Sequence, residues 1–205
     1  MIPYDYKYKI VLIGDSKVGK TSFFNRINQN ITFTTTTTIG VDLCTVSRII
    51  DDKHIRICLW DTAGQEQFQS IVRSYFREAC GAILMFDLSN YSTFKHVAQW
   101  IKLLQFENTC HHIHPILLLG NKSDKNNNNV PSYEIDKLCD EGNIIYNEIS
   151  CKSDNITTLE KIFTSIVGKI FFNNYESCRG IKDCYKNTTN VREEINKPDK
   201  WMCCI

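Results

Sequence analysis

The sequence carries almost no net charge and no long hydrophobic run. Its 24 lysines and arginines are balanced by 23 aspartates and glutamates, which leaves a formal net charge of +1. This balance gives no broad electrostatic reason to expect a nucleic-acid partner. The longest apolar stretches, such as residues 10–13 and 83–86, fall far below the roughly 20 residues that a membrane-spanning helix needs. The opening residues, MIPYDYKYK, lack the apolar core of a signal peptide, so secretion is not expected.

Cysteine, in contrast, is abundant, with ten copies. The cysteines are scattered, and several lie in apolar runs typical of strands or helices. This distribution favours buried, reduced thiols in the cytosol over a framework of disulfides. At 205 residues, the chain is long enough for one domain with a substantial core and an additional tail.

Short apolar segments alternate with amphipathic ones along most of the chain. Alternation of this kind predicts an α/β fold with a mostly parallel sheet of six strands and helices on both faces. A hairpin that turns at Asp51 and Asp52 adds one antiparallel edge strand. We expect strands at residues 7–13, 41–50, 53–60, 82–88, 115–119 and 144–149, and helices at 20–28, 94–104, 132–140 and 156–170.

The first motif that points to chemistry is GDSKVGKT at residues 14–21. It matches G-x-x-x-x-G-K-[ST] between an expected strand and an expected helix. Gly14 and Gly19 let the backbone fold tightly around oxyanions, while the loop N–H groups and the helix N-terminus face the phosphates. Lys20 can reach the β and γ phosphates, and the Thr21 hydroxyl can bind Mg²⁺. The motif alone does not separate ATP from GTP.

The motif NKSD, from Asn121 to Asp124, makes that distinction. It follows an expected strand, and a carboxylate there can accept hydrogen bonds from N1–H and N2–H₂ of guanine. Adenine has no N2 amine and would leave a carboxylate oxygen unpaired. NKSD therefore opposes the rival hypothesis of an ATPase or kinase and favours a guanine nucleotide.

The third motif is WDTAGQ at residues 60–65. Asp61 ends an expected strand, where its carboxylate can support Mg²⁺. Gly64 offers a backbone N–H to a γ-phosphate, and the Gln65 amide can orient an attacking water. Together with Thr38, Gln65 argues against the second rival, a nucleotide-binding scaffold without turnover.

Five motifs in this order and spacing resemble those of the Ras-superfamily small GTPases. They are GDSKVGKT, TIGVD (38–42), WDTAGQEQF (60–68), NKSD and SCK (150–152). A finer resemblance is to the Rab family, through IGVDL (39–43), RICLW (56–60), QFQSIV (67–72), YFREA (75–79) and LMFDLS (84–89). It covers about residues 7–172. The resemblance implies the P-loop NTPase fold and a GTP hydrolase that switches between GTP- and GDP-bound forms to regulate vesicle trafficking.

The resemblance assigns a role to each motif residue. Lys20 would bind the β and γ phosphates. Thr21, Thr38 and Asp61 would hold Mg²⁺. Gln65 would be the catalytic residue that positions water.

At the base, Asn121, Lys122 and Asp124 would recognise guanine, and backbone N–H groups around Cys151 and Lys152 would meet its carbonyl. The full nucleotide-binding set that the resemblance implies is Gly14, Asp15, Ser16, Lys17, Val18, Gly19, Lys20, Thr21, Ser22, Thr38, Gly64, Asn121, Lys122, Asp124, Ser150, Cys151 and Lys152.

The chain departs from the family pattern at three places. Lys17 occupies a loop position where the family usually has a small residue, and we expect it to face solvent. An aromatic ring usually stacks on guanine from the segment after Thr21, and either Ile31 or Phe33 takes that place here. Leu43 replaces a phenylalanine. The effector-facing residues would then be Ile39, Leu43, Trp60 and Phe76.

The organisation expected from the sequence is a short extension (1–6), a GTP-binding domain (7–172) and a flexible tail (173–205). Rab-like chains carry geranylgeranyl groups on paired cysteines, which predicts lipidation at Cys203 and Cys204 and a place on the cytoplasmic face of internal membranes, with cycling through the cytosol. The implied partners are an exchange factor, a GTPase-activating protein, effectors, and the prenylation escort and GDP-dissociation inhibitor.

Overall fold

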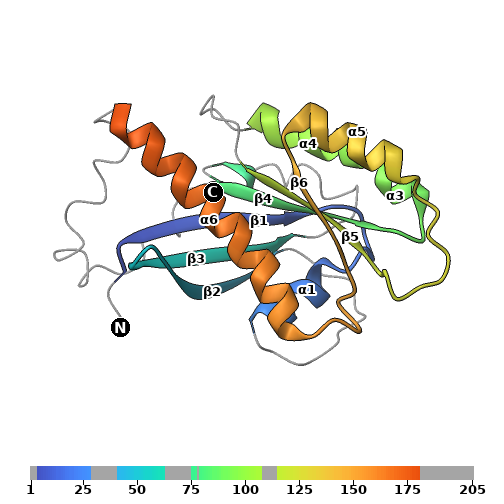
Figure 1. Cartoon of the computed structure of the whole chain (residues 1–205), viewed down its shortest axis with the longest axis horizontal. Coiled ribbons are helices and arrows are strands. Elements are labelled where there is room, and N and C mark those ends of the chain that lie inside the picture. Colours follow the sequence, from blue (N-terminus) through green and yellow to red (C-terminus); the bar gives the residue numbers. More distant parts are fainter. Residues whose placement is uncertain (1–3, 29–40, 63–74, 78, 108–114, 181–205) are drawn as a thin grey trace. The chain divides into compact units, whose positions relative to one another are not determined.

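The computed structural model describes residues 4–28, 41–62, 75–77, 79–107 and 115–180. The chain divides into two compact units, Met1–Ile170 and Phe171–Ile205, and the described strands all belong to the first. In chain order the elements are β1 (Tyr6–Ile13), α1 (Lys20–Ile27), β2 (Val41–Ile50), β3 (Lys53–Thr62), β4 (Gly81–Asp87), α3 (Tyr91–Lys95), α4 (Val97–Glu107), β5 (Ile116–Asn121), α5 (Ser132–Gly142), β6 (Ile145–Ile149) and α6 (Ile156–Gly180) (Figure 1).

The described strands form one six-stranded sheet in the order β2-β3-β1-β4-β5-β6. β2 pairs with β3 antiparallel, and every other pair is parallel. The hairpin turns at Asp51 and Asp52, whose φ angles of 51° and 59° are left-handed, as a tight two-residue turn requires. The predicted α/β sheet with one antiparallel edge strand is confirmed.

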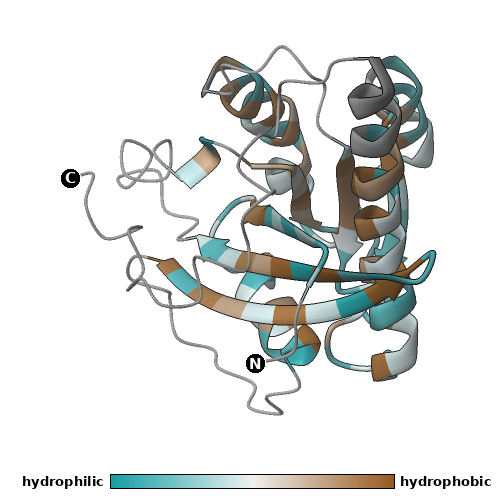
Figure 2. Ribbon diagram, turned by 90° about the vertical axis from the view of Figure 1, so that its left-hand side faces the viewer, coloured by the Kyte–Doolittle hydropathy of each residue, from teal (hydrophilic) through white to brown (hydrophobic). Residues whose placement is uncertain are grey.

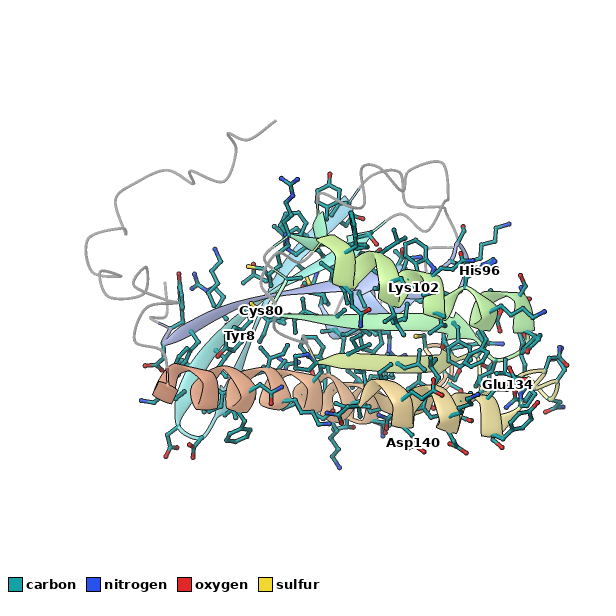
Figure 3. All side chains as sticks on the ribbon, turned by 90° about the horizontal axis from the view of Figure 1, so that it is seen from above. Tyr8, Cys80, His96, Lys102, Glu134 and Asp140 are labelled. Carbon is teal, nitrogen blue, oxygen red and sulfur yellow. The ribbon has the colours of Figure 1, made fainter. Side chains whose placement is uncertain are left out.

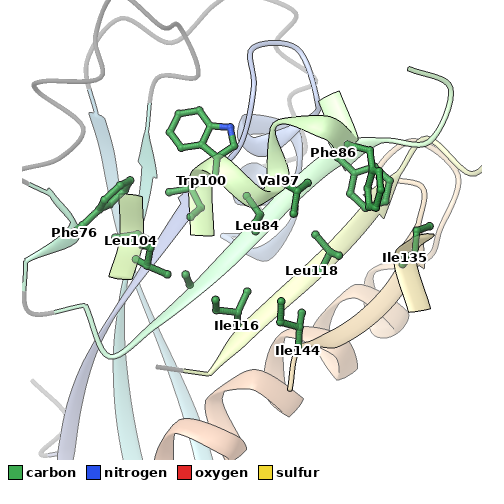
Figure 4. Packing of buried hydrophobic residues seen from close by; sticks show 14 of the residues in the cluster. Phe76, Leu84, Phe86, Val97, Trp100, Leu104, Ile116, Leu118, Ile135 and Ile144 are labelled. Carbon is green, nitrogen blue, oxygen red and sulfur yellow. The ribbon is translucent and has the colours of Figure 1, made fainter. Parts of the chain in front are cut away.

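The central strands are buried on both faces, and every residue of β4 and β5 is buried. On one face, a hydrophobic cluster joins the strands to α3, α4 and α5 (Figure 4). Alternate residues of the strands supply it, because successive side chains of a strand point to opposite faces. Its members include Val11, Ile13, Leu84, Phe86, Phe94, Val97, Trp100, Leu104, Ile116, Leu118 and Ile135.

The opposite face carries α6. The guanidinium of Arg48 on β2 lies 5.4 Å from the ring centroid of Phe163 and 3.6 Å from a carboxylate oxygen of Glu160. Arg48 pairs with Ile55 in the β2–β3 register, so the fully buried Ile55 shares this face. Hydrophobic and polar residues accordingly alternate along the strands of the hairpin (Figure 2).

Several element limits differ from the expected ones; β3, for example, ends at Thr62, and β5 spans Ile116–Asn121. The first strand begins at Tyr6. The backbone N–H of Asp5, just before it, donates to the backbone oxygen of His54, and the backbone N–H of His54 donates to Oδ2 of Asp5. The helix expected at 94–104 is two helices, because Asn90 caps a first short one and a second begins at Val97. The last helix continues to Gly180, beyond the expected end at residue 170. None of the described helices is long and apolar enough to cross a bilayer.

Candidate functional site

The loop GDSKVGKT connects β1 to α1 at the carboxyl end of the parallel strands. Gly14 and Gly19 have φ angles of 135° and 110°, which L side chains rarely adopt. A Cβ at Gly14 would lie 2.2 Å from the backbone oxygen of Met85 on β4. A Cβ at Gly19 would lie 2.1 Å from Nδ2 of Asn121. Both glycines of the motif are thus required by close packing as well as by backbone conformation.

Lys17 in the same loop also has a left-handed backbone, with φ of 64°. Its side chain is exposed, as the sequence predicted. A left-handed conformation costs a residue with a Cβ about 1–2 kcal/mol. The lysine therefore occupies a position where glycine would be less strained. Its side chain faces solvent and not the interior of the loop.

Lys20, the first residue of α1, is only 6% exposed, and its ammonium lies inside the loop. Nζ donates to the backbone oxygen of Gly14 at 2.8 Å and to that of Asp15 at 2.7 Å. Burial lowers the pKa of Lys20 to about 8, while the carboxylates of Asp61 and Asp15 act in the opposite direction. The loop thus holds one cation at its centre.

Thr21 and Asp61, two of the three predicted Mg²⁺ ligands, are in direct contact. The Thr21 hydroxyl donates to Oδ2 of Asp61 at 2.6 Å. The end of β3 is fixed by the next residue, because the Thr62 hydroxyl donates to the backbone oxygen of Leu12 at 2.6 Å. The end of β3 therefore presents the Asp61 carboxylate to the Thr21 hydroxyl at the start of α1.

Asn121 at the end of β5 connects two loops of the site. Its Nδ2 donates to the backbone oxygen of Val18 at 2.7 Å, and its Oδ1 accepts from the backbone N–H of Cys151 at 3.0 Å. The side chain is only 2% exposed. The phosphate loop and the segment 150–152 are thus fixed to each other through one amide.

Asp124 and Ser150 are also joined, since the Ser150 hydroxyl donates to Oδ1 of Asp124 at 2.6 Å. This hydrogen bond lowers the pKa of Asp124, whose side chain is exposed. The N–H groups expected for the guanine carbonyl have protein acceptors: that of Cys151 bonds Asn121, and that of Lys152 bonds Ser150 Oγ at 3.3 Å. A guanine carbonyl would have to share or replace these acceptors.

Sequence reasoning missed the partners of Lys122. Lys122 has a left-handed backbone, and its Nζ lies 2.6 Å from Oδ2 of Asp87, at the end of β4. Burial acts to raise the pKa of Asp87, but hydrogen bonds from Lys122 and Ser89 outweigh it, so the pKa is lowered. Asn129 adds a bond from Nδ2 to the backbone oxygen of Ser89 at 2.7 Å. A carboxylate at the carboxyl end of a predicted strand was the available signal for Asp87.

Several predicted site residues lie outside the described part of the chain. They are Ile31, Phe33, Thr38, Ile39, Gly64, Gln65, Cys203 and Cys204. Ser16 and Ser22 of the phosphate loop and helix are described and are half-buried.

Comparison with known proteins assigns the chain to a family. The model described as the Ras family matches residues 9–172. Ras-related protein Rab-11B of Dictyostelium discoideum is 35% identical over 99% of this chain and 98% of its own length. Ras-related protein RABA1e of Arabidopsis thaliana is 37% identical over 82% of this chain and 76% of its own, and Ras-related protein rab-11.1 of Caenorhabditis elegans is 33% identical over 98% and 96%. The chain belongs to the Rab small GTPases of the Ras family.

As a Rab-family small GTPase, the protein hydrolyses GTP and acts as a GTP/GDP-dependent switch in vesicle trafficking. Ras-family GTPases bind GTP or GDP, generally with Mg²⁺, and Rab proteins work with regulators and effectors. The Rab relatives also point to an association with vesicles or other internal membranes.

The expected effector-facing surface of this Rab protein is only partly exposed. Leu43 on β2 is 55% exposed. Trp60 is half-buried between the Lys9 ammonium, 4.7 Å from its ring centroid, and the Tyr75 ring at 5.5 Å. Phe76 is fully buried, so the prediction that it faces a partner is wrong for this structure. Its ring packs in the cluster beneath α4.

Because the phosphate loop of this Rab protein encloses Lys20, we expect its affinity for GDP to fall as the pH rises above about 8. Phosphate oxygens favour the charged ammonium, so above this pH binding has to take up a proton, and the fall is limited to about tenfold per pH unit. Binding of a fluorescent GDP analogue, followed from neutral pH to about 9.5, measures it. Lys20→Arg is the matched control, because a guanidinium stays charged. An equal slope in both proteins would contradict the expectation.

Without nucleotide, the lowered pKa of Lys20 makes the folded protein more stable as the pH rises, whereas nucleotide binding weakens over the same range. The pKa of Lys20 is lower in the folded chain than the unfolded value of 10.5, so burial of the ammonium costs stability below about pH 8. This cost disappears as the pH rises from about 8 towards 10.5. The unfolding free energy of the nucleotide-free protein should therefore rise in this window.

Proposed function

We propose that the described residues form a single guanine-nucleotide site with two ends. The phosphate end is residues 14–22, and the base end is residues 121–124 with 150–152. The observation that carries the proposal is the side chain of Asn121, which hydrogen-bonds to Val18 in the first set and to Cys151 in the second. Two motifs far apart in the chain are thereby fixed in one arrangement.

The side chains at the phosphate end fit a polyphosphate with Mg²⁺. The ammonium of Lys20 and the N-terminus of α1 are positive, and Thr21 and Asp61 supply oxygen atoms, which Mg²⁺ prefers as ligands. Thr38 would complete this set. When bound, the metal would neutralise charge that develops on the phosphates. The protein's own part is to bind and orient the nucleotide.

Turnover depends on positioning a water. The Gln65 amide would donate and accept hydrogen bonds to orient it, and the N–H of Gly64 would bind the γ-phosphate. Residues 30–40 and 62–78 would be held while the γ-phosphate is present and released after hydrolysis. Effectors that contact the held form would bind one nucleotide state only.

We expect the purified protein to bind GDP and GTP with Mg²⁺ in strong preference to ADP and ATP, and chelation of Mg²⁺ to speed release. Gln65→Leu should leave GTP affinity within about twofold and remove most turnover, since the residue acts on the water and not on the ground-state nucleotide. Competition binding and single-turnover phosphate release, with and without an activating protein, measure both. Preference for adenine nucleotides would refute the site, whereas equal turnover of the two proteins would refute only the role of Gln65.

The finer partners belong to the same proposal. An exchange factor, a GTPase-activating protein, effectors, and the prenylation escort and GDP-dissociation inhibitor would act on this switch. Geranylgeranyl groups on Cys203 and Cys204 would place it on the cytoplasmic face of internal membranes. One lipid chain holds a protein only marginally, so two are needed for stable anchoring unless charge helps. Residues 173–205 carry six basic and five acidic side chains, so charge does not supply the second signal.

Lipidation predicts a mass increase of two prenyl groups on the peptide that contains Cys203 and Cys204. Mass spectrometry of protein from its native cells measures it, and replacement of both cysteines by serine should move a fluorescently tagged chain from membranes to the cytosol. Replacement of Cys184, which lies in the same segment, is the matched control. An unmodified peptide from native cells would remove the membrane proposal and leave the nucleotide site intact.

A further inference from the structure

The carboxylate of Asp15, the second residue of the phosphate loop, is held by two donors from outside the loop. Oδ2 lies 2.6 Å from Nδ1 of His96, and Oδ1 accepts from Nε1 of Trp100 at 2.9 Å. A carboxylate only accepts hydrogen bonds, so His96 Nδ1 carries the hydrogen. Both oxygens of this acidic group are therefore engaged.

The two donors lie where α3 meets α4. His96 is the C-cap of α3, and Figure 3 labels it at this junction. Trp100 follows four residues later, which places it on the same side of the helix, and its backbone N–H donates to the His96 carbonyl at 3.0 Å. The Trp100 ring is buried in the hydrophobic cluster, so the direction of its N–H is fixed by the core.

The charge of Asp15 matters for the phosphates. The backbone oxygen of Asp15 accepts from Lys20, so the residue borders the loop interior. Its carboxylate is also one of the two that act to raise the pKa of Lys20, against the larger effect of burial. A negative charge that close to the loop would repel a polyphosphate, and it would do so more strongly for each added phosphate.

We propose that His96 and Trp100 are positioning residues for nucleotide binding: by donating to both oxygens of Asp15, they keep its carboxylate turned away from the phosphate loop. The inference rests on the nucleotide site proposed above. It adds two residues, His96 and Trp100, that lie outside the sequence motifs of that site. Without these donors, the carboxylate turns towards the loop and competes with the phosphates for Lys20. The loss of binding affinity then grows with the number of phosphates on the nucleotide. A general loosening of the loop would not produce this dependence.

His96→Ala tests this directly, because the side chain is partly exposed and its removal leaves the core intact. We expect about tenfold weaker binding of GDP and GTP and a much smaller loss for GMP. His96→Asn keeps a donor and should restore part of the affinity. In the double variant Asp15→Asn/His96→Ala, an uncharged amide replaces the repelling group, so it should bind GDP more tightly than His96→Ala alone.

Lys95→Ala is the matched control on the neighbouring turn. The Lys95 side chain is exposed and lies over the Tyr91 ring at 4.8 Å, so its removal should leave GDP affinity unchanged. Titrations with labelled GMP, GDP and GTP supply the affinities, and thermal unfolding shows that each variant is folded.

Equal affinity of His96→Ala and the wild type for GDP would overturn the inference. So would a loss of the same size for GMP, GDP and GTP, or a double variant no better than His96→Ala. These outcomes leave the nucleotide site standing, which fails only if the wild type itself binds no guanine nucleotide.

Discussion

Replacement of Asn121 by alanine is expected to weaken GDP binding at least about a hundredfold. The amide hydrogen-bonds both to the phosphate loop and to the segment that carries Cys151. Its loss leaves the Val18 carbonyl and the Cys151 N–H without a partner in a buried place, at about 1–3 kcal/mol for each group. The two ends of the site are then no longer fixed relative to each other. Nucleotide binding has to order them, which reduces the net binding free energy.

Isothermal titration with GDP, together with urea unfolding, separates the loss of binding from the loss of stability. Asn121→Asp is a second variant, because its carboxylate can still accept from Cys151 but cannot donate to Val18. Asn128→Ala is the matched control, since this exposed asparagine accepts only a local bond from the backbone N–H of Val130. A Kd for Asn121→Ala within tenfold of the wild-type value would contradict the bridging role.

Alanine at Gly14 is expected to lower the unfolding free energy by about 3–5 kcal/mol, even without nucleotide. Gly14 has φ of 135°, and the added Cβ would lie 2.2 Å from the backbone oxygen of Met85. That oxygen belongs to β4, which pairs directly with β1, so it can move only if the sheet itself shifts. Because whole domains are stable by only about 5–15 kcal/mol, this loss would remove a large share of the protein's total stability.

Gly168→Ala is the control, for which we expect a change in the unfolding free energy of opposite sign. Gly168 lies inside α6, and the nearest atom to an added Cβ is Cδ1 of Ile50, at 4.0 Å. Alanine is favoured over glycine in a helix by about 0.5–1 kcal/mol, so this variant should be more stable than the wild type. Urea denaturation of both variants gives the comparison. Similar changes for Gly14→Ala and Gly168→Ala would contradict the packing described for the phosphate loop.

The sequence predicted those parts of the protein whose structure depends on residues that are close together in the chain. The β2 strand has the expected limits, and the order of motifs brought Lys20, Thr21 and Asp61 together as expected. A motif that combines a strand end, a tight turn and a helix start constrains its own backbone. The residues that it places therefore need little information from the rest of the chain.

Contacts between distant segments could not be predicted in the same way. Asp15 is 81 residues from His96, and Asp87 is 35 residues from Lys122. Periodicity tells which face of an element a residue occupies, but not which side chain from another element meets it there. The expectation for Phe76 failed for this reason, because its neighbours in the core come from other elements.

The length of α6 sets a limit on how this switch can work at a bilayer. The helix continues to Gly180, which leaves 23 peptide steps (203 minus 180) before Cys203. A fully extended chain covers at most 3.3–3.6 Å per residue, so these steps reach about 80 Å. A lipid on Cys203 would therefore confine the end of the helix to a shell of that thickness above the headgroups.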